Sequence, residues 1–516
     1  MMDTKGLKKK MKKKLPKKKP SLVKAVLDEA KRNEKKLAQK SGGCPTSKQA
    51  AGESDYIIDG SASVAPKDYI EKPSSTERAE AAFAWLIAPV STQDFYKNYF
   101  EKKPFVVRHK DPSYYKHLLS TKQLDTVLRE RDVHFEKNID LTSYVNGKRE
   151  TVLLEGRALP ALVWQYYSEG CSVRLLNPQS YVEAVHTLCY TLAEHFSSFV
   201  GANVYLTPAG TQGFAPHWDD IDAFVLQLEG KKRWKVYEPR NEDEELPLVS
   251  SGNLDRDELV DPPIIETTLE TGDLLYMPRG FIHEASSCED DHSLHITISA
   301  NQRNTWSDYL KILLPAALEL ATESNVEFRR TLPRNYLQNM GVMHSDLENK
   351  ARQMFSEIAS NLVQKLLKEA PFDPAADQMA VNYMHDSLPP VLNSSEKELT
   401  ASHRARWNCE TLNGNSSFDH VNPETEVCLI SKNCVRVASE EESVFAYHIA
   451  DNTSVYRERE EPYKIEITPP EANVIEFLVS KYPAFVRLKD IPLEGSPEDV
   501  REIIHTLYFK NLLLAK

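Results

Sequence analysis

The chain has 516 residues, of which 41% are hydrophobic, and it carries a formal net charge of −12. This length is too great for one compact domain and is sufficient for two or three. There is no run of about 18 apolar residues and no apolar signal segment, so we expect no membrane-spanning helix and no secretion. The seven cysteines are scattered without a CxxC pair, which excludes a disulfide framework and a zinc module and favours a reducing intracellular compartment.

The first twenty residues form a basic arm. Residues 1–20 hold ten lysines and one aspartate, so they carry +9 and the rest of the chain carries −21. Such dense lysines are typical of a nuclear or nucleolar targeting signal or of a segment that attracts RNA, although a solubilising tail has the same composition. We expect the protein in the nucleus and nucleolus. Residues 41–78 are rich in Ser, Gly, Pro and Ala and predict a disordered linker, so residues 1–78 are taken as one arm.

Globular character begins near Glu80 with helical stretches over residues 80–100, and β-rich runs follow between residues 200 and 302. The expected strands are Asn203–Thr207, Asp222–Leu228, Lys232–Glu238, Asp273–Met277 and His292–Ala300. Glu229-Gly230-Lys231 predicts a hairpin turn between the second and third of these strands. Several short strands separated by turns predict a β-barrel or a β-sandwich.

After Trp306 the pattern becomes helical. One helix is expected over residues 306–322, and a second carries an apolar stripe at spacings of three and four residues. The stripe consists of Leu347, Ala351, Met354, Ile358, Leu362 and Leu366. It fits either ordinary packing within the chain or a dimer interface, and periodicity alone does not choose between them.

The last part of the chain predicts a small α+β domain similar to a winged helix. One helix should begin at Pro469-Pro470, and another at Pro497 with Ser496 as its N-cap. Residues 462–516 hold seven Lys and Arg against eight Asp and Glu, whereas a DNA-binding winged helix should be basic. We therefore expect this domain to pack or to contact protein, and we do not expect it to bind DNA directly.

A candidate metal centre begins at His217-Trp218-Asp219. Residues i and i+2 of an extended strand project to the same side, so His217 and Asp219 can point into a barrel while Trp218 points away. The run Gly272–His283 ends a strand, turns at a Pro-x-Gly and delivers His283. Two histidines and one carboxylate make the facial triad of non-haem iron(II) oxygenases, with positions left open. Unrelated histidines, or a zinc or manganese cupin, are the alternatives.

Lys232 is the candidate anchor for an anionic cosubstrate. Lys232, Trp234 and Val236 share one face of their strand, so the lysine should face inward, where a buried cation needs an anion. An edge lysine that reaches solvent is the alternative. Polar rows on neighbouring strands predict a lined pocket: Asn203 with Tyr205, and His295 with Thr297 and Ser299.

The runs Asn203–Pro208, Gln212–Asp220 and Phe224–Gly230 closely resemble the JmjC ribosomal oxygenases, and within them the nucleolar histidyl hydroxylase branch. The resemblance covers residues 80–516. It implies an α+β chain with a double-stranded β-helix core in a JmjC oxygenase domain over residues 79–305. A helical dimerisation region over residues 306–385 and a winged-helix-like domain over residues 386–516 should follow.

The resemblance also implies roles for individual residues. Iron(II) would be held by His217, Asp219 and His283, and the distal carboxylate of 2-oxoglutarate by Lys232, with O2 as the other cosubstrate. Asn203, Tyr205 and Thr297 match positions on the cosubstrate side of the pocket, and Arg174 and Ser299 match positions on the substrate side. Two features depart from the family: Trp218 stands where tyrosine is common, and the acidic insertion Glu242–Asp261 is individual to this chain and has no assigned role.

The implied activity is 3-hydroxylation of a histidine in a large-subunit ribosomal protein, by a homodimer. Lysine demethylation of histone H3 has been attributed to the same family. Both reactions begin with hydroxylation of a C–H bond, so the triad does not decide between them. A non-catalytic ribosome-assembly or chromatin scaffold is the third hypothesis, and the intact triad with Lys232 argues against it.

Overall fold

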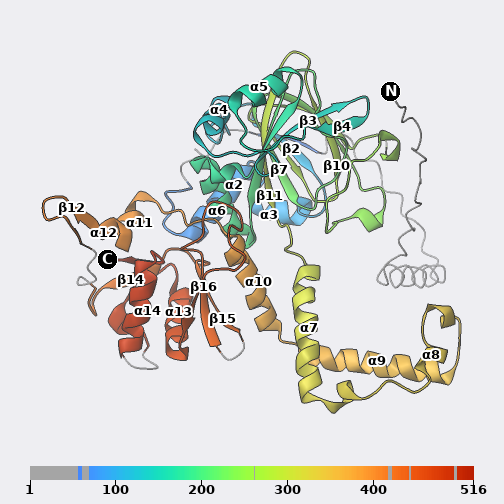
Figure 1. Cartoon of the computed structure of the whole chain (residues 1–516), viewed down its shortest axis with the longest axis vertical. Helices are drawn as coiled ribbons and strands as arrows, with labels where there is room; N and C mark the ends of the chain where they lie inside the picture. Colours follow the sequence, from blue (N-terminus) through green and yellow to red (C-terminus); the bar gives the residue numbers. More distant parts are fainter. Residues whose placement is uncertain (1–55, 61–68, 261, 416–420, 441–442, 493–496) are drawn as a thin grey trace, which may run out of the picture. The chain divides into compact units, whose positions relative to one another are not determined.

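The computed structural model describes residues 56–60, 69–260, 262–415, 421–440, 443–492 and 497–516 (Figure 1). Among them, residues 321–368 form one compact unit and the other described residues form a second. The basic arm and the N-cap expected at Ser496 lie outside the described residues. No described helix is long and apolar enough to span a bilayer.

An extended β-sheet system dominates the second unit. Its strands are β1 (Ile57–Asp59), β2 (Phe105–Arg108), β3 (Ile139–Val145), β4 (Lys148–Thr151), β5 (Ser172–Leu176), β6 (Gly201–Thr207), β7 (Asp222–Tyr237), β8 (Ile265–Glu270), β9 (Leu274–Met277), β10 (Ile282–Ser287) and β11 (Ser293–Ala300). The hydrogen-bonded order is β1-β2-β9-β7-β11-β6-β5-β3-β4, and β8 and β10 both pair with β7 off this path.

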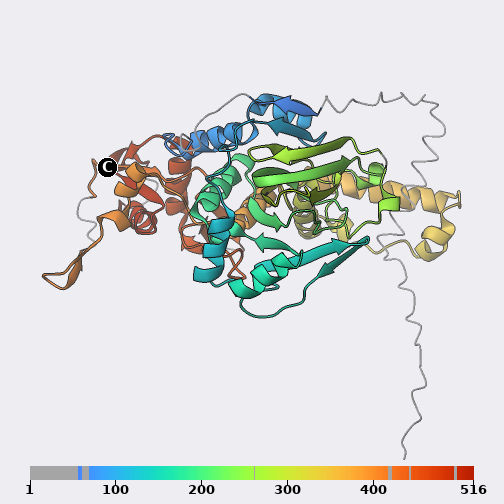
Figure 2. The same ribbon diagram turned by 90° about the horizontal axis from the view of Figure 1, so that it is seen from above.

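Strand β7 belongs to two sheets. Its first half pairs with β9 and β11, and from Lys231 onward it pairs with β8 and β10. The two sheets face each other and enclose the core of a barrel (Figures 1 and 2). The expected hairpin at Glu229-Gly230-Lys231 is therefore wrong, because the chain bends there without reversing. Gly230 makes the bend possible, with φ of +64° and the carbonyl oxygen of His292 only 1.8 Å from where a Cβ would stand.

Helices α2 (Ser75–Ile87) and α6 (Glu183–Phe196) pack together beside the larger sheet (Figure 1). The Ser74 side chain caps α2 by accepting from the Glu77 N–H. The disordered linker expected over 41–78 is wrong in two places, since α2 begins within it and β1 pairs in parallel with β2. Its apolar pair Ile57-Ile58 supplied a strand signal that the surrounding Ser and Gly residues obscured.

The other helices of the sheet region are short. They are α3 (Thr92–Asp94), α4 (Thr121–Glu130) and α5 (Pro160–Ser168). Helix α7 (Trp306–Ser324) follows β11, as expected for residues 306–322. In the smaller unit, α8 (Tyr336–Asn339) precedes α9 (Lys350–Lys368), which contains no buried residue. Leu347, expected at the start of the apolar stripe, lies before α9.

The C-terminal part has helices α10 (Phe372–Asp386), α11 (Ser394–Glu398), α12 (Ala401–Arg404), α13 (Pro469–Lys481) and α14 (Pro497–Phe509). Its strands are β12 (Arg406–Asn408), β13 (Asn413–Asn415), β14 (Glu426–Leu429), β15 (Val435–Glu440), β16 (Ser443–His448), β17 (Lys464–Ile467), β18 (Val486–Arg487) and β19 (Leu513–Ala515). They form the sheets β18-β14-β19 and β15-β16-β17 and the hairpin β12-β13. A capping box between Thr468 and Glu471 starts α13 at the expected proline pair.

This C-terminal part packs on the barrel region. The guanidinium of Arg78 in α2 donates two hydrogen bonds of 2.9 Å to the Glu396 carboxylate in α11, and both side chains are buried. The Tyr482 hydroxyl joins Ser75 at 2.7 Å. Apolar residues of both parts also belong to one continuous core cluster. The packing role expected for the winged-helix-like domain is confirmed.

Candidate metal centre

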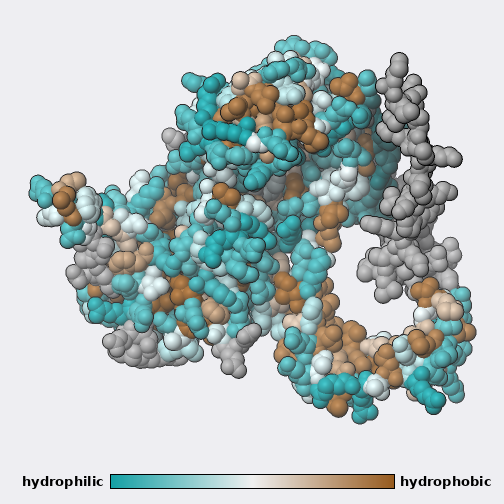
Figure 3. Space-filling model, viewed as in Figure 1, coloured by the Kyte–Doolittle hydropathy of each residue, from teal (hydrophilic) through white to brown (hydrophobic). Residues whose placement is uncertain are grey.

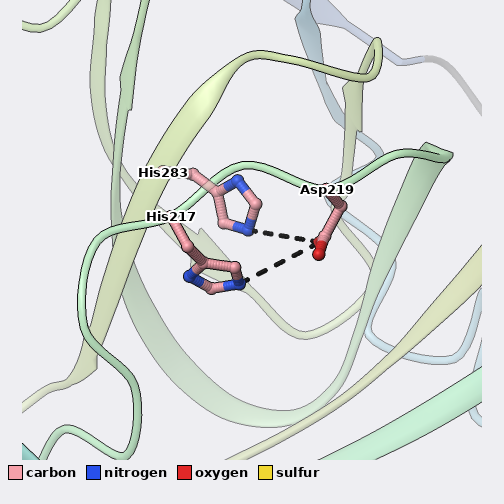
Figure 4. Close-up of side chains that lie close together, drawn as sticks. All are labelled: His217, Asp219 and His283. Atoms are coloured by element: carbon pink, nitrogen blue, oxygen red, sulfur yellow. Dashed lines mark ion pairs between the residues drawn. The ribbon is translucent and has the colours of Figure 1, made fainter. Parts of the chain in front are cut away.

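Two backbone segments present the triad side by side. His217 and His283 form an antiparallel bridge, with N–H···O distances of 3.2 Å and 2.8 Å between their backbones. The Asp219 Oδ2 atom lies 4.0 Å from the Nε2 of His217 and 3.7 Å from the Nε2 of His283 (Figure 4). One ligand atom from each residue therefore lies within 4.8 Å of the others.

Both imidazoles are held with Nε2 toward the carboxylate. The Nδ1 of His217 lies 2.8 Å from the Ala215 carbonyl, and the Nδ1 of His283 lies 3.1 Å from the Phe281 carbonyl. A carbonyl only accepts, so each Nδ1 carries the proton and each Nε2 keeps a free lone pair. Burial, and then the neighbouring His217, lower the pKa of His283 to about 4, so this imidazole is neutral and able to bind a metal.

These residues fit a divalent transition metal. Two donor atoms each about 2.1 Å from one ion lie at most about 4.2 Å apart, and both distances to Asp219 satisfy this limit. The donor groups are two imidazoles and one carboxylate, and all three line one small cavity. This is the donor set of a facial triad, which leaves other coordination positions of the metal open.

Lys232 lies in the same cavity, which has a volume of about 50 Å³. Its side chain is buried, and its Nζ donates a 3.1 Å hydrogen bond to the Thr207 hydroxyl. No carboxylate of the described residues forms an ion pair with it. Burial lowers the pKa of Lys232 to about 7. Its Nζ also lies 5.9 Å from the centre of the Trp234 ring. A buried cation that has a hydroxyl and a ring beside it, and no anion among the described residues, fits a site whose anion arrives with a ligand.

A second cavity of about 380 Å³ lies against the first. Tyr205, Phe214, His217, Asp219 and Thr297 line both cavities. Of the other expected pocket residues, Asn203, Ser299 and Arg174 line only this larger cavity and are absent from the lining of the smaller one that contains Lys232. We call the 380 Å³ cavity the outer cavity and the 50 Å³ cavity, which contains Lys232, the inner cavity.

Arg174 reaches the outer cavity as a neutralised cation. Its Nε donates a 2.9 Å hydrogen bond to the Asp140 carboxylate, and a second guanidinium nitrogen contacts the same oxygen. The Tyr205 side chain, on the neighbouring strand β6, also forms a hydrogen bond with the Arg174 guanidinium. Trp218 points away from the metal centre, as expected: it lines neither cavity and packs with Arg240, whose guanidinium lies 5.6 Å from its ring centre.

One site residue, Arg149, had no sequence signal, and a second, His295, was predicted only as part of a polar row without a role of its own. Arg149 of β4 lines the outer cavity and stacks 4.3 Å over the Phe214 ring, yet its buried Nε has no partner and it pairs with no acid among the described residues. His295 of β11 stacks on Tyr205 in the inner cavity with its Nδ1 unpartnered, and burial lowers its pKa well below the usual value. Arg149 stands in the charged run Lys148–Thr151, which looks like solvent-exposed hairpin, whereas the phase of His295 did place it in a polar row.

Comparison with known proteins assigns the family. Residues 174–309 match the JmjC domain, and residues 388–516 match the C-terminal winged helix domain of ribosomal oxygenase 1. Ribosomal oxygenase 1 of Gallus gallus is 47% identical over 444 residues, which cover 86% of this chain and 73% of the relative. The human ribosomal oxygenase 1 is also 47% identical, over 86% of this chain and 69% of the relative.

Other relatives carry a different name. The bifunctional lysine-specific demethylase and histidyl-hydroxylase NO66 of Aedes aegypti is 43% identical over 84% of this chain and 67% of the relative. Among solved structures, the Escherichia coli ribosomal oxygenase YcfD in complex with cobalt and 2-oxoglutarate is 16% identical, covers 82% of this chain and 98% of its own, and has a TM-score of 0.42, which is too low to support any argument. The sequence identity to ribosomal oxygenase 1, over 86% of this chain, shows that the chain belongs to the JmjC ribosomal oxygenase family.

Proposed function

We propose that this chain is an iron(II)- and 2-oxoglutarate-dependent oxygenase that hydroxylates a histidine of a large-subunit ribosomal protein. The observation that carries the proposal is the shared inner cavity, where the triad and the unpaired cation Lys232 lie together. Family membership supports an oxygenase, and the names of the relatives, ribosomal oxygenase 1, support ribosomal protein as the kind of substrate.

The inner cavity would bind the metal and 2-oxoglutarate, and the outer cavity would bind the substrate. His217, Asp219 and His283 would hold iron(II), which when bound supplies the activation of dioxygen needed to hydroxylate a C–H bond. Lys232 would neutralise the distal carboxylate of 2-oxoglutarate and so fix its orientation in the inner cavity. The substrate side chain would enter through the outer cavity, whose wall contains Asn203 and Ser299.

The test is a product assay with the full chain. Supplied with iron(II), 2-oxoglutarate and oxygen, it should add the mass of one oxygen atom to a histidine of a ribosomal protein, as located by tandem mass spectrometry. His217→Ala should abolish this product, and His403→Ala, an exposed histidine of α12, should not. No product together with no succinate release would favour the scaffold hypothesis.

Histone demethylation is the second candidate, because relatives are named for both activities. The same assay with methylated histone H3 peptides should then show stepwise loss of methyl groups from lysine. The better substrate, compared at equal concentrations, decides between the two reactions.

We also propose that the protein is a homodimer, held by the apolar stripe of α9. Met354 and Ile358 of this stripe are 60% and 51% exposed, and no residue of α9 is buried. Figure 3 shows apolar side chains gathered along this helix. A helix with an apolar stripe and no buried residue needs a partner for stability in water, and the family resemblance makes a second copy the expected one.

The oligomeric state tests this proposal. Light scattering of the full chain at micromolar concentration should give twice the chain mass. Met354→Asp with Ile358→Asp should shift the mass toward that of the monomer, and Ser360→Asp on the opposite face of α9 should leave it unchanged. A monomeric natural chain would overturn the proposal.

Nuclear and nucleolar localisation is likewise proposed, from the lysines of residues 5–19. A polycation of this density binds nucleic acid through counterion release. A fluorescent fusion of the full chain should concentrate in nucleoli, and replacing these lysines by glutamine should spread it through the cell. An unchanged distribution would count against the arm as the signal.

A further inference from the structure

The acidic insertion, residues 242–261, forms backbone hydrogen bonds with the segment that carries His217 and Asp219. The Ser251 backbone N–H donates 3.0 Å to the Trp218 carbonyl, and the Leu254 N–H donates 2.9 Å to the Pro216 carbonyl. Residues 216–219 are bonded on their other side to residues 280–283. The ligand segment is therefore the middle of three extended segments, and the insertion supplies one of its two neighbours.

Two adjacent serines of the insertion hold the backbone on either side of Asp219. The Trp218 N–H donates 2.9 Å to the Ser251 hydroxyl, and the Asp220 N–H donates 3.2 Å to the Ser250 hydroxyl. Ser250 in turn donates to the Asp220 carboxylate at 2.6 Å. The two amides that flank the ligand are thus fixed by neighbouring hydroxyl groups.

The Asp219 carboxylate lies beside the same Ser250 hydroxyl, whose proton is directed at Asp220. Its Oδ2 faces both imidazoles, whereas its Oδ1 lies 3.5 Å from the Ser250 hydroxyl. A metal-binding carboxylate that uses one oxygen depends on the surroundings of the other oxygen to keep its orientation.

The insertion is anchored firmly enough to act in this way. Leu254 is buried in a cluster with Tyr237 and Ile282. Arg256 pairs at 2.8 Å with Glu284, the residue that follows the ligand His283. The insertion is consequently attached to both ligand-bearing segments.

We infer that Ser250 and Ser251 are positioning residues that hold Asp219 in its metal-binding orientation. The inference rests on the proposed metal site and adds a role for the insertion. Both serines also line the outer cavity.

Cobalt(II) binding tests the inference without catalysis. The full chain, freed of metal, is titrated with cobalt(II), and binding is followed by the visible d–d absorption of the ion. Ser250→Ala with Ser251→Ala should raise the dissociation constant about tenfold or more, as loss of such supporting hydrogen bonds does at other metal sites. Glu245→Gln, an exposed residue of the same insertion, should not change it.

Further variants separate positioning from folding. Ser250→Ala and Ser251→Ala singly should each weaken cobalt binding by part of the effect, and Ser251→Thr, which keeps the hydroxyl, should bind as the natural chain does. The metal-free thermal midpoint should change little in all of them. Natural affinity in the double variant overturns the positioning role and leaves the proposed function intact, whereas a natural chain that does not bind cobalt overturns both.

Discussion

Lys232 is a buried cation, and the partner it has among the described residues is a hydroxyl group. With its pKa lowered to about 7, the cosubstrate-free protein loses the charge of Lys232 above that pH. A dicarboxylate binds the charged form, so its dissociation constant should rise roughly tenfold per pH unit above 7 and stay level below it. Calorimetric titration of the manganese-loaded chain with 2-oxoglutarate over this range measures the effect.

Two variants isolate the contribution of Lys232. Lys232→Met should weaken 2-oxoglutarate binding and remove its pH dependence, while Lys231→Met, a half-exposed neighbour paired with Glu270, should preserve both. The unfolded chain keeps the proton up to about pH 10.5, so the free energy of unfolding of the cosubstrate-free protein should rise from pH 7 toward that value. A pH-independent dissociation constant in the natural chain would contradict this account.

Arg149 is the outer-cavity cation that its surroundings leave unpaired. Arg149→Met should raise the KM for the polypeptide substrate severalfold, because the guanidinium is available to an acceptor of that substrate. The free energy of unfolding should change by less than about 1 kcal/mol, since the lost stacking on Phe214 is offset by removing a half-buried unpaired charge. Lys148→Met on the same hairpin is the control, and an equal rise in KM there would contradict a specific role.

The residues that could be predicted follow a short-range rule. His217 and Asp219 are two positions apart in an extended segment, and Lys232 is in phase with Trp234, so alternation placed all three toward the cavity. Arg149 could not be placed in this way, because its position depends on β3 pairing with β5, which joins residues thirty or more positions apart. The positioning contacts of Ser250 and Ser251 could not be predicted either. The insertion has no alternation of polar and apolar residues, so its sequence does not indicate which way its side chains point.

Strand β7 is the element that closes the barrel, and Gly230 is its critical position. A side chain there would meet the His292 carbonyl in a left-handed backbone conformation, so Gly230→Ala should lower the free energy of unfolding by roughly 3 kcal/mol or more. Gly147→Ala is the matched control: it also has positive φ, at +77°, but no atom within 4 Å, and should cost about 1 kcal/mol. Equal losses measured by chemical denaturation would contradict the steric account.

The same element shows where sequence patterns mislead. Both halves of β7 were predicted as strands, yet a glycine between charged residues is also typical of a hairpin turn, and the local pattern is the same for a turn and for a bend. The difference lies in the partners, since β8 and β10 continue the pairing that β9 and β11 begin. Neither β8 nor β10 was predicted, so the continuation could not be recognised.

At the scale of the whole molecule, the buried pair of Arg78 and Glu396 joins the barrel region to the winged-helix-like part. Arg78→Met leaves the buried Glu396 carboxylate without its cation, with the Asn393 N–H of the α11 capping box as its remaining hydrogen-bond donor among the described residues, and should cost about 3 kcal/mol of unfolding free energy. Adding Glu396→Leu should recover part of this loss, because no buried charge remains, while the Asn393 N–H loses its capping-box acceptor. Thermal denaturation of the single and double variants completes the cycle, and additive losses would show that the pair is not coupled.

The continuous core has a consequence for how the protein is made. Leu512, Leu513 and Ala515 are fully buried and belong to the same cluster as Phe83 and Phe224 near the barrel. These residues are synthesised after nearly all the others described, so the core cluster that spans both parts is completed only when translation has passed them. The nascent enzyme should therefore remain a client of chaperones for most of its synthesis, and a premature stop within residues 388–511 should yield a degraded product rather than a smaller active one.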